Sequence, residues 1–356
     1  MRDIVFEHTE DCNQFTFKDD LGTDYCFEYH PSIEGLWKGI NLADFDVQLL
    51  IHPFLNKESN VFSLQSNLKT KEETVGFVFP VSVLDSDSFE AKRSSDNNYL
   101  FAAYQVLLTR LSLVKEGIDT LSPCFEDNVC VCVLNLRTIG RNRGVWNCIH
   151  SLRKFGYSYF VEHNQYKEIE GYSLKNYKAL LPGSRMHVDF AIPSIYSDPI
   201  IDGILRSLPK ADNLVYRFIL LYQIVEFLIS KRVSASIHDV IKEYQETSSC
   251  SENDFLESIN HIRKERGVIS EILDDCGITQ STECNKELNK YCQHLYDLAG
   301  ITPQKKDEGN LFYSFRNQMV HSFRHLSDFQ EELANTVFYF EQVVLAIVER
   351  CPYAMN

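Results

Sequence analysis

Three polar residues near the C-terminal end of the chain could act together on a phosphate group. Arg316, Asn317 and His321 lie in the run SFRNQMVH, residues 314–321. Histidine titrates near neutral pH, so it can accept and return a proton. Arginine keeps its positive charge and offers a planar set of donors that fits phosphate oxygens. The set therefore predicts phosphodiester chemistry that uses acid–base catalysis and a fixed cation in place of a metal ion.

The spacing of these residues predicts how a helix would present them. Asn317 and His321 are four residues apart and would share a helix face, where the amide could orient the imidazole or hold a phosphate oxygen. Arg316 is five residues from His321, about 140° around a helix, so its side chain must curl back or reach toward a second copy of the chain. The apolar residues between them, Met319 and Val320, are expected in the core together with Phe315.

The same run resembles the signature of the HEPN superfamily, in which an arginine and a polar residue stand a few positions before a histidine. The apolar run YRFILLYQIVEFL, residues 216–228, is similar to the first long helix of HEPN domains of the ApeA-like, abortive-infection type. The resemblance covers roughly residues 205–350. It implies an all-α bundle that dimerises so that two motifs face each other. It also implies a metal-independent endoribonuclease of a prokaryotic antiviral defence or toxin system, in which the RNA 2′-hydroxyl attacks the adjacent phosphorus.

One feature of related toxins is replaced in this chain. HEPN toxins that a paired nucleotidyltransferase silences carry a tyrosine two residues after the histidine, and here that position is Phe323. Control by tyrosine modification at this position is therefore not expected. The arginine–histidine spacing alone is not specific, because it recurs twice where glycine or valine follows the arginine: Arg143 with His150, and Arg232 with His238.

Two further sets of charged residues could support the motif. Glu226 lies in the apolar run, where a buried carboxylate is costly unless it is paired. It could neutralise Arg316 or tune His321, or it could simply mark the edge of the apolar face; Arg217 and Gln223 pose the same question. The second set is a basic run that either positions RNA or forms a polar helix face: Arg263, Lys264 and Arg266.

Other interpretations of these residues stay open. His321 could be a packed helix histidine, and Arg316 could pair with Glu308 or another carboxylate. The basic loop at residues 138–144 could contact phosphate or be a solvated turn. His187 and Asp189 share a strand face but lack a third ligand, so neither a metal site nor a cofactor is expected. The alternative function is a non-catalytic, HEPN-like dimerisation or binding protein.

The elements that must position the motif form two domains of an α+β fold. Residues 1–207 show short alternating runs typical of strands, at 3–8, 13–18, 25–29, 47–51, 76–83, 127–136 and 186–192, with helices at 99–115 and 146–155. This strand-rich mixed domain is expected to sense a trigger or restrain the second domain. Residues 208–356 carry apolar residues at helical spacing, which predicts an all-α bundle with helices at 213–230, 235–247, 253–275, 284–299, 309–322 and 327–350.

Composition limits the partners and the compartment. The formal net charge is −15, so RNA must be bound by a local basic patch rather than by the whole surface. The 11 cysteines form no C-x-x-C pair and no apolar leader precedes them, which favours a reducing cytoplasm. The apolar run from Leu214 to Ile229 is too short and too polar to span a bilayer. The expected partners are RNA, a second copy of the chain, and a trigger or regulatory protein at the N-terminal domain.

Overall fold

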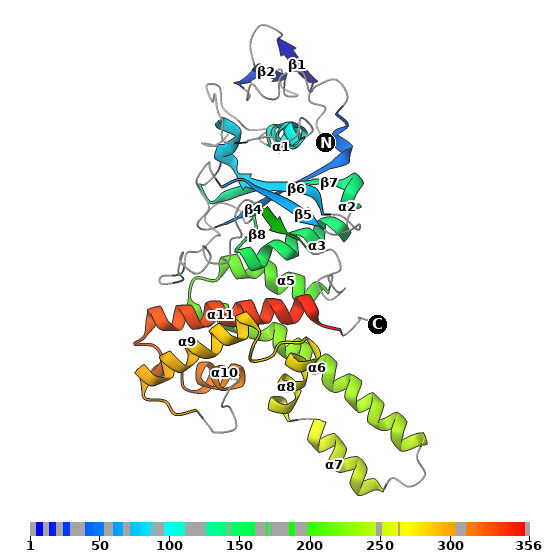
Figure 1. Cartoon of the computed structure of the whole chain (residues 1–356), viewed down its shortest axis with the longest axis vertical. Coiled ribbons are helices and arrows are strands. Elements are labelled where there is room, and N and C mark those ends of the chain that lie inside the picture. The colour runs from blue at the N-terminus through cyan, green and yellow to red at the C-terminus, as the bar shows by residue number, and fades with distance from the viewer. Residues whose placement is uncertain are drawn as a thin grey trace. The chain divides into compact units, whose positions relative to one another are not determined.

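The chain divides into two compact units, which we call the sheet unit and the helical unit (Figure 1). The computed structural model describes residues 5–9, 14–18, 24–28, 40–52, 60–66, 72–86, 89, 96–110, 125, 127–140, 143–160, 169, 172, 185–188, 198–246, 251–262, 264–303 and 311–352. The sheet unit comprises Met1–His163 and Tyr177–Ala191, and the helical unit comprises Asn164–Asn176 and Ile192–Asn356. The mixed first part and the helical second part confirm the coarse fold prediction.

The boundary between the units differs from the predicted one at residues 207/208. The helical unit takes in Asn164–Asn176 and then continues from Ile192, so helix α5 (Pro199–Ser207) belongs to it. The start of α5 is well defined, because the side chain of Asp198 accepts a hydrogen bond from the Ile200 amide and Pro199 occupies the first turn. This Asp-Pro signal was present in the sequence, but no helix was predicted at this place.

Two sheets form the sheet unit. Strands β1 (Val5–Thr9), β2 (Gln14–Lys18) and β3 (Asp24–Glu28) make an antiparallel meander. A six-stranded sheet has the order β8-β4-β7-β6-β5-β9, antiparallel except between β5 and β9. Its strands are β4 (Phe45–Ile51), β5 (Phe62–Ser66), β6 (Glu73–Pro80), β7 (Val129–Asn135), β8 (Ser158–Tyr159) and β9 (Arg185–His187).

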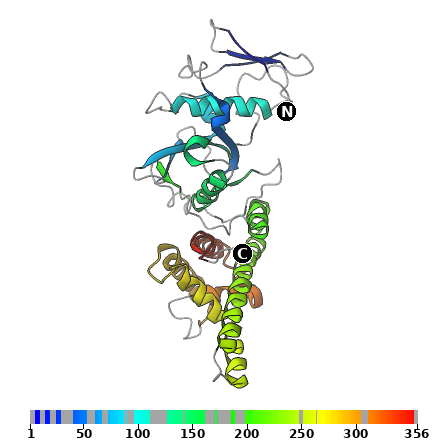
Figure 2. The same cartoon turned by 90° about the vertical axis from the view of Figure 1, so that its right-hand side faces the viewer.

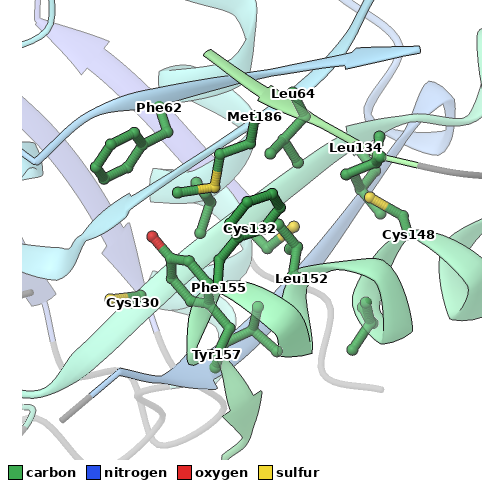
Figure 3. Packing of buried hydrophobic residues seen from close by; sticks show 14 of the residues in the cluster. Phe62, Leu64, Cys130, Cys132, Leu134, Cys148, Leu152, Phe155, Tyr157 and Met186 are labelled. Atoms are coloured by element: carbon green, nitrogen blue, oxygen red, sulfur yellow. The ribbon is translucent and has the colours of Figure 1, made fainter. Parts of the chain in front are cut away.

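Strand β7 is buried on both faces, which explains its unbroken apolar sequence. Val129, Val131 and Val133 face a cluster that includes α1 (Asn97–Arg110). The alternate residues Cys130 and Cys132 face a second cluster that includes α3 (Arg143–Leu152). Figure 3 shows this second core, where side chains of β5, β7, β9 and α3 pack together. Helices therefore cover both faces of the six-stranded sheet.

A glycine and a histidine of the sheet unit are constrained by their surroundings. A Cβ at Gly76 would lie 2.3 Å from the backbone oxygen of Val133, so only glycine fits between β6 and β7. His52 is fully buried, and its Nε2 lies 2.9 Å from the backbone oxygen of Phe155. Burial lowers the pKa of His52 to about 4, so it stays neutral at pH 7.

The helical unit is built around one central helix. α11 (Gln330–Arg350) is buried on nearly every side, as expected of a helix that is apolar all round. Around it lie α6 (Leu214–Glu246), α8 (Glu265–Asp275), α9 (Glu283–Ala299) and α10 (Phe312–His321). Aromatic rings of α11 pack against three of these helices. The ring centre of Phe340 lies 4.9 Å from that of Phe218 of α6 and 4.6 Å from that of Phe312 of α10, and the ring centre of Tyr339 lies 4.9 Å from that of Tyr291 of α9.

Two helix predictions were wrong at their boundaries. Helices predicted at 213–230 and 235–247 are one continuous helix, α6, of 33 residues. The helix predicted at 253–275 is two, α7 (Glu252–Ile262) and α8. The second half of α6 pairs with α7 through rings of Tyr244 and Phe255 that lie 4.9 Å apart. We call this hairpin, residues 229–262, the arm; Figures 1 and 2 show α6 running outward from the bundle.

None of the helices within the described residues combines the length and apolar character needed to cross a bilayer.

Candidate functional site

Helix α10 presents the predicted motif on its outward face. Phe312, Phe315 and Met319 are buried and form the inward stripe, at spacings of three and four residues. Arg316 and Asn317 are half-buried on the other side. Val320 also points outward and is 49 % exposed, so its predicted place in the core was wrong. The helix thus offers its polar residues to the surface while three apolar residues anchor it.

Arg316 is held by side chains from two other helices. Its guanidinium lies over the ring of Tyr222 of α6, with 4.9 Å from the central carbon to the ring centre. Its Nη2 lies 3.1 Å from Oε1 of Glu265, the first residue of α8. Its Nη1 donates to Oδ1 of Asn317 over 3.0 Å. Helices α6, α8 and α10 therefore meet at this guanidinium.

Tyr222 and Arg316 share one carboxylate oxygen. The hydroxyl of Tyr222 donates to Oε1 of Glu265, the same atom that faces Arg316. Burial and then the nearby Glu265 carboxylate raise the pKa of Tyr222 well above its ordinary value, so the phenol remains a donor. The Arg316 side chain is 15 % exposed, and its Nε has no hydrogen-bond partner among the described residues. That Nε is buried, so an anion that reaches the guanidinium would bind at Nη1 and Nη2, each of which already makes one contact.

His321 ends α10 and is exposed. No residue that the structure describes forms a hydrogen bond with its ring, which does not fit the interpretation as a packed helix histidine. Asn317 stands one turn before it on the same side of the helix, as the spacing predicted. Helix α10 thus carries an exposed imidazole and a partly exposed guanidinium, two groups that can each contact a phosphodiester in solvent.

Glu226 is not the carboxylate that neutralises Arg316. It is exposed on α6, and Glu265 takes that place instead. One alternative prediction was that Arg316 pairs with Glu308 or another carboxylate. Glu308 lies outside the described residues. Glu226 does follow Tyr222 by four residues and so shares its side of α6. Two residues of the site, Tyr222 and Glu265, were not singled out in the sequence.

The basic run lies at the start of α8. Arg263 is outside the described residues. Lys264 is exposed and directly precedes Glu265, and Arg266 directly follows it and is half-buried. Because Glu265 contacts Arg316, the fold brings Lys264 and Arg266 to the neighbourhood of the motif.

The remaining candidate sites stay without support. Gly140 takes φ of 76° at the end of a short helix, Leu136–Ile139, and residues 141–142 of the basic loop lie outside the described residues. His187 lies 3.4 Å from Glu72, and Asp189 is outside the described residues. Within the part of the chain that the structure describes, no three histidine, cysteine, aspartate or glutamate residues gather as a metal site would require.

Comparison of the chain with protein-family models, curated proteins and solved structures gave no match. The candidate site is therefore defined by its own geometry: an outward arginine, asparagine and histidine on α10, with the arginine held by Tyr222 and Glu265.

Proposed function

We propose that this protein is a metal-independent endoribonuclease of the HEPN type. The observation that carries the proposal is the outward face of α10, where the Arg316 side chain is partly exposed and His321 is exposed at the helix end. The chemistry of these side chains suits a phosphodiester. The guanidinium binds the non-bridging oxygens, the imidazole moves protons, and Asn317 orients Arg316 through its hydrogen bond.

The proposed step is an intramolecular transfer within the RNA. The 2′-oxygen forms a bond to phosphorus while the bond from phosphorus to the 5′-oxygen breaks. One imidazole takes the proton of the 2′-hydroxyl, and the leaving 5′-oxygen receives a proton from an imidazolium. The products are a 2′,3′-cyclic phosphate and a 5′-hydroxyl, and no metal is required. Arg316 offsets the charge that develops on phosphorus.

The need for both an acceptor and a donor favours a dimer. One chain offers one His321 in this site, whereas a two-fold dimer with α10 near its axis would supply two motifs to one cleft. Glu226 would line that cleft, and Lys264 and Arg266 would guide RNA toward it. We place the enzyme in the cytoplasm of a prokaryote, in antiviral defence or as a toxin, with the sheet unit responding to a trigger. The free cysteines among the described residues suit a reducing compartment.

Cleavage of RNA in EDTA tests the proposal. Wild-type protein is expected to cut RNA and leave 2′,3′-cyclic phosphate ends, and His321→Ala should lose about a hundredfold or more. His294→Ala is the matched control, because His294 is an exposed histidine on α9, outside the motif. Wild-type rates from His321→Ala, a requirement for Mg²⁺ or 5′-phosphate products would each contradict the mechanism.

Mixed dimers test whether two motifs share one site. Arg316→Ala and His321→Ala chains are each expected to be inactive alone. If the two motifs divide the roles, a mixture should recover part of the wild-type activity. A mixture that stays inactive would mean that each motif serves its own half, and a monomer by sedimentation would remove the composite site.

A non-catalytic dimerisation or binding protein is the second candidate. Two observations favour it: Arg316 already has a carboxylate partner in Glu265, and the exposed Val320 gives the same face an apolar contact point. This candidate predicts self-association that Val320→Asp weakens, with no RNA cleavage by wild-type protein. The nuclease predicts cleavage that depends on His321.

A further inference from the structure

The carboxylate that holds Arg316 occupies the same kind of position that a phosphate oxygen would take. Nη2 of Arg316 lies 3.1 Å from Oε1 of Glu265. Carboxylates and phosphates are the two anions whose geometry matches a guanidinium. The contact is also half-open to solvent, because the Arg316 and Glu265 side chains are 15 % and 32 % exposed. An incoming phosphate can therefore reach the guanidinium only beside or in place of this carboxylate.

Resting on the function proposed above, we propose that Glu265 is a built-in competitor of RNA phosphate for Arg316. Its negative charge satisfies Arg316 in the empty site and repels any second anion there. RNA binds when a phosphate displaces the carboxylate from Nη2, while the ring of Tyr222 continues to support the guanidinium. Glu265 thereby sets how much RNA affinity the site has, and it restrains the nuclease at low RNA concentration.

Tyr222 keeps the Glu265 carboxylate close to Arg316. Its hydroxyl donates to the same Oε1 that Arg316 faces, so the carboxylate has a second anchor. When a phosphate takes the guanidinium, Glu265 can keep its bond to Tyr222 and need not leave the site. The ring and the hydroxyl of Tyr222 thus serve two partners, the cation and the displaced anion.

Helix α8 does not depend on Glu265 for its place. Val268, Ile269, Ile272 and Leu273 are buried. Arg232 of α6 separately pairs with α8, at 3.2 Å from Glu271 and 3.4 Å from Asp275. Substitution of Glu265 should therefore change the charge beside Arg316 while the helix stays docked.

Glu265→Gln isolates the charge, because glutamine keeps an oxygen acceptor for Tyr222 and Arg316. Glu271→Gln is the matched control: it lies on the same helix and makes the same charge change, but it faces Arg232. The probe is a fluorescent RNA oligonucleotide carrying 2′-O-methyl groups, which has no nucleophile and cannot be cut. Glu265→Gln should bind it about tenfold more tightly than wild type, and Glu271→Gln within about twofold.

A second pair of variants keeps the test decisive. In an Arg316→Ala background, Glu265→Gln should bring no gain in RNA affinity, because the guanidinium for which carboxylate and phosphate compete is absent. Glu265→Asp keeps the charge at the start of α8 but withdraws it by one methylene, so it should gain less than Glu265→Gln. It replaces Glu265→Gln if that variant fails to fold by circular dichroism.

The outcomes separate this inference from the proposed function. Cleavage by wild type without any gain in Glu265→Gln over Glu271→Gln leaves the nuclease standing and overturns the competitor. A gain that requires Arg316, in a protein that never cuts unmodified RNA, supports the competitor and sinks the nuclease. Weaker binding by Glu265→Gln would show that the carboxylate positions Arg316 for RNA, which contradicts the inference.

Discussion

The helical unit builds the same three-residue arrangement twice, once inside and once near the surface. Arg217 lies over the ring of Tyr172 at 4.6 Å and pairs with Glu341, to which Tyr172 also donates. Arg316 lies over the ring of Tyr222 at 4.9 Å and pairs with a carboxylate to which that tyrosine donates. An arginine, a tyrosine and a glutamate in contact are therefore not by themselves a sign of function here.

The two arrangements differ in how completely the arginine is used. Arg217 donates to both oxygens of Glu341, at 2.8 and 3.0 Å, and to the backbone oxygen of Leu208 at 3.0 Å. Both side chains of that pair are exposed by 10 % or less. Arg316 makes one contact to a carboxylate that is 32 % exposed. The buried arginine has a structural task, whereas Arg316 is more open to solvent and makes fewer contacts to its carboxylate.

The largest expected effect is the loss of the buried pair. Arg217→Ala leaves Glu341 buried without its cation, which costs about 3–5 kcal/mol of unfolding free energy. Urea denaturation followed by circular dichroism at the helical band measures it. The double variant Arg217→Met with Glu341→Leu should recover part of the loss, because no charge is then left unpaired. A loss below about 1 kcal/mol for Arg217→Ala would erase the contrast between the two arginines.

Arg316→Ala should reverse the pattern of stability and activity. The exposed pair and the stacking on Tyr222 are together worth about 1 kcal/mol, so the protein should remain folded. RNA cleavage should fall about a hundredfold or more, since the phosphate loses its cation. A stability loss as large as that of Arg217→Ala would mean that Arg316 has a structural role like that of Arg217. Unchanged cleavage would remove it from the site.

The two tyrosine hydroxyls offer a smaller comparison. Tyr172→Phe removes a donor to a buried carboxylate and should cost about 1.5–3 kcal/mol. Tyr222→Phe removes the same bond where water can replace it, and should cost about 1 kcal/mol or less. Both variants keep the ring beneath the arginine. Thermal unfolding of the pair measures the difference, and equal losses would mean that the Tyr222 contact is as closed to water as the inner one.

The smallest expected effect is on the ionisation of Tyr222. Glu265 adds to the burial that raises the pKa of this phenol. Neutral glutamine at position 265 should therefore lower that pKa, so the phenolate should form at lower pH. Nuclear magnetic resonance of ring-labelled tyrosine follows the titration, with the signal assigned by Tyr222→Phe. Glu271→Gln should leave it unchanged, and equal shifts in both variants would show that Glu265 does not contact Tyr222.

The sequence predicts elements well where one period dominates. The apolar run at residues 127–136 was predicted as a strand and forms β7, and Phe315 and Met319 of α10 were predicted in the core, where they lie. Prediction from the sequence is weakest at the ends of helices. The polar residues around Arg232 predicted the end of a helix, yet no glycine or proline stands there, and Arg232 finds partners on α8 that let α6 continue.

Spacing along one helix predicts that Asn317 and His321 share a face, and it predicts nothing about the residues that surround Arg316. The residues that hold Arg316 come from other helices, and even Tyr222 and Glu265 are 43 positions apart. Glu226 was considered as a partner of Arg316 because it is surrounded by apolar residues, whereas Glu265 lies among other charged residues and was not considered. Tertiary packing places Glu265 and not Glu226 against Arg316, and no local sequence pattern predicts that contact.

Helix α6 joins two environments within one hydrogen-bonded rod. Its buried side chains end at Leu228, although its backbone continues to Glu246. The 18 residues beyond Leu228 extend it by about 27 Å. Amide protons of the inner half can exchange with deuterium only when the bundle opens, while those of the outer half need only local fraying. Exchange times along this single helix should therefore fall by orders of magnitude from Leu228 to Glu246, and the part of the arm beyond Arg232 can unfold and re-form while the contacts of α6 with α8 remain.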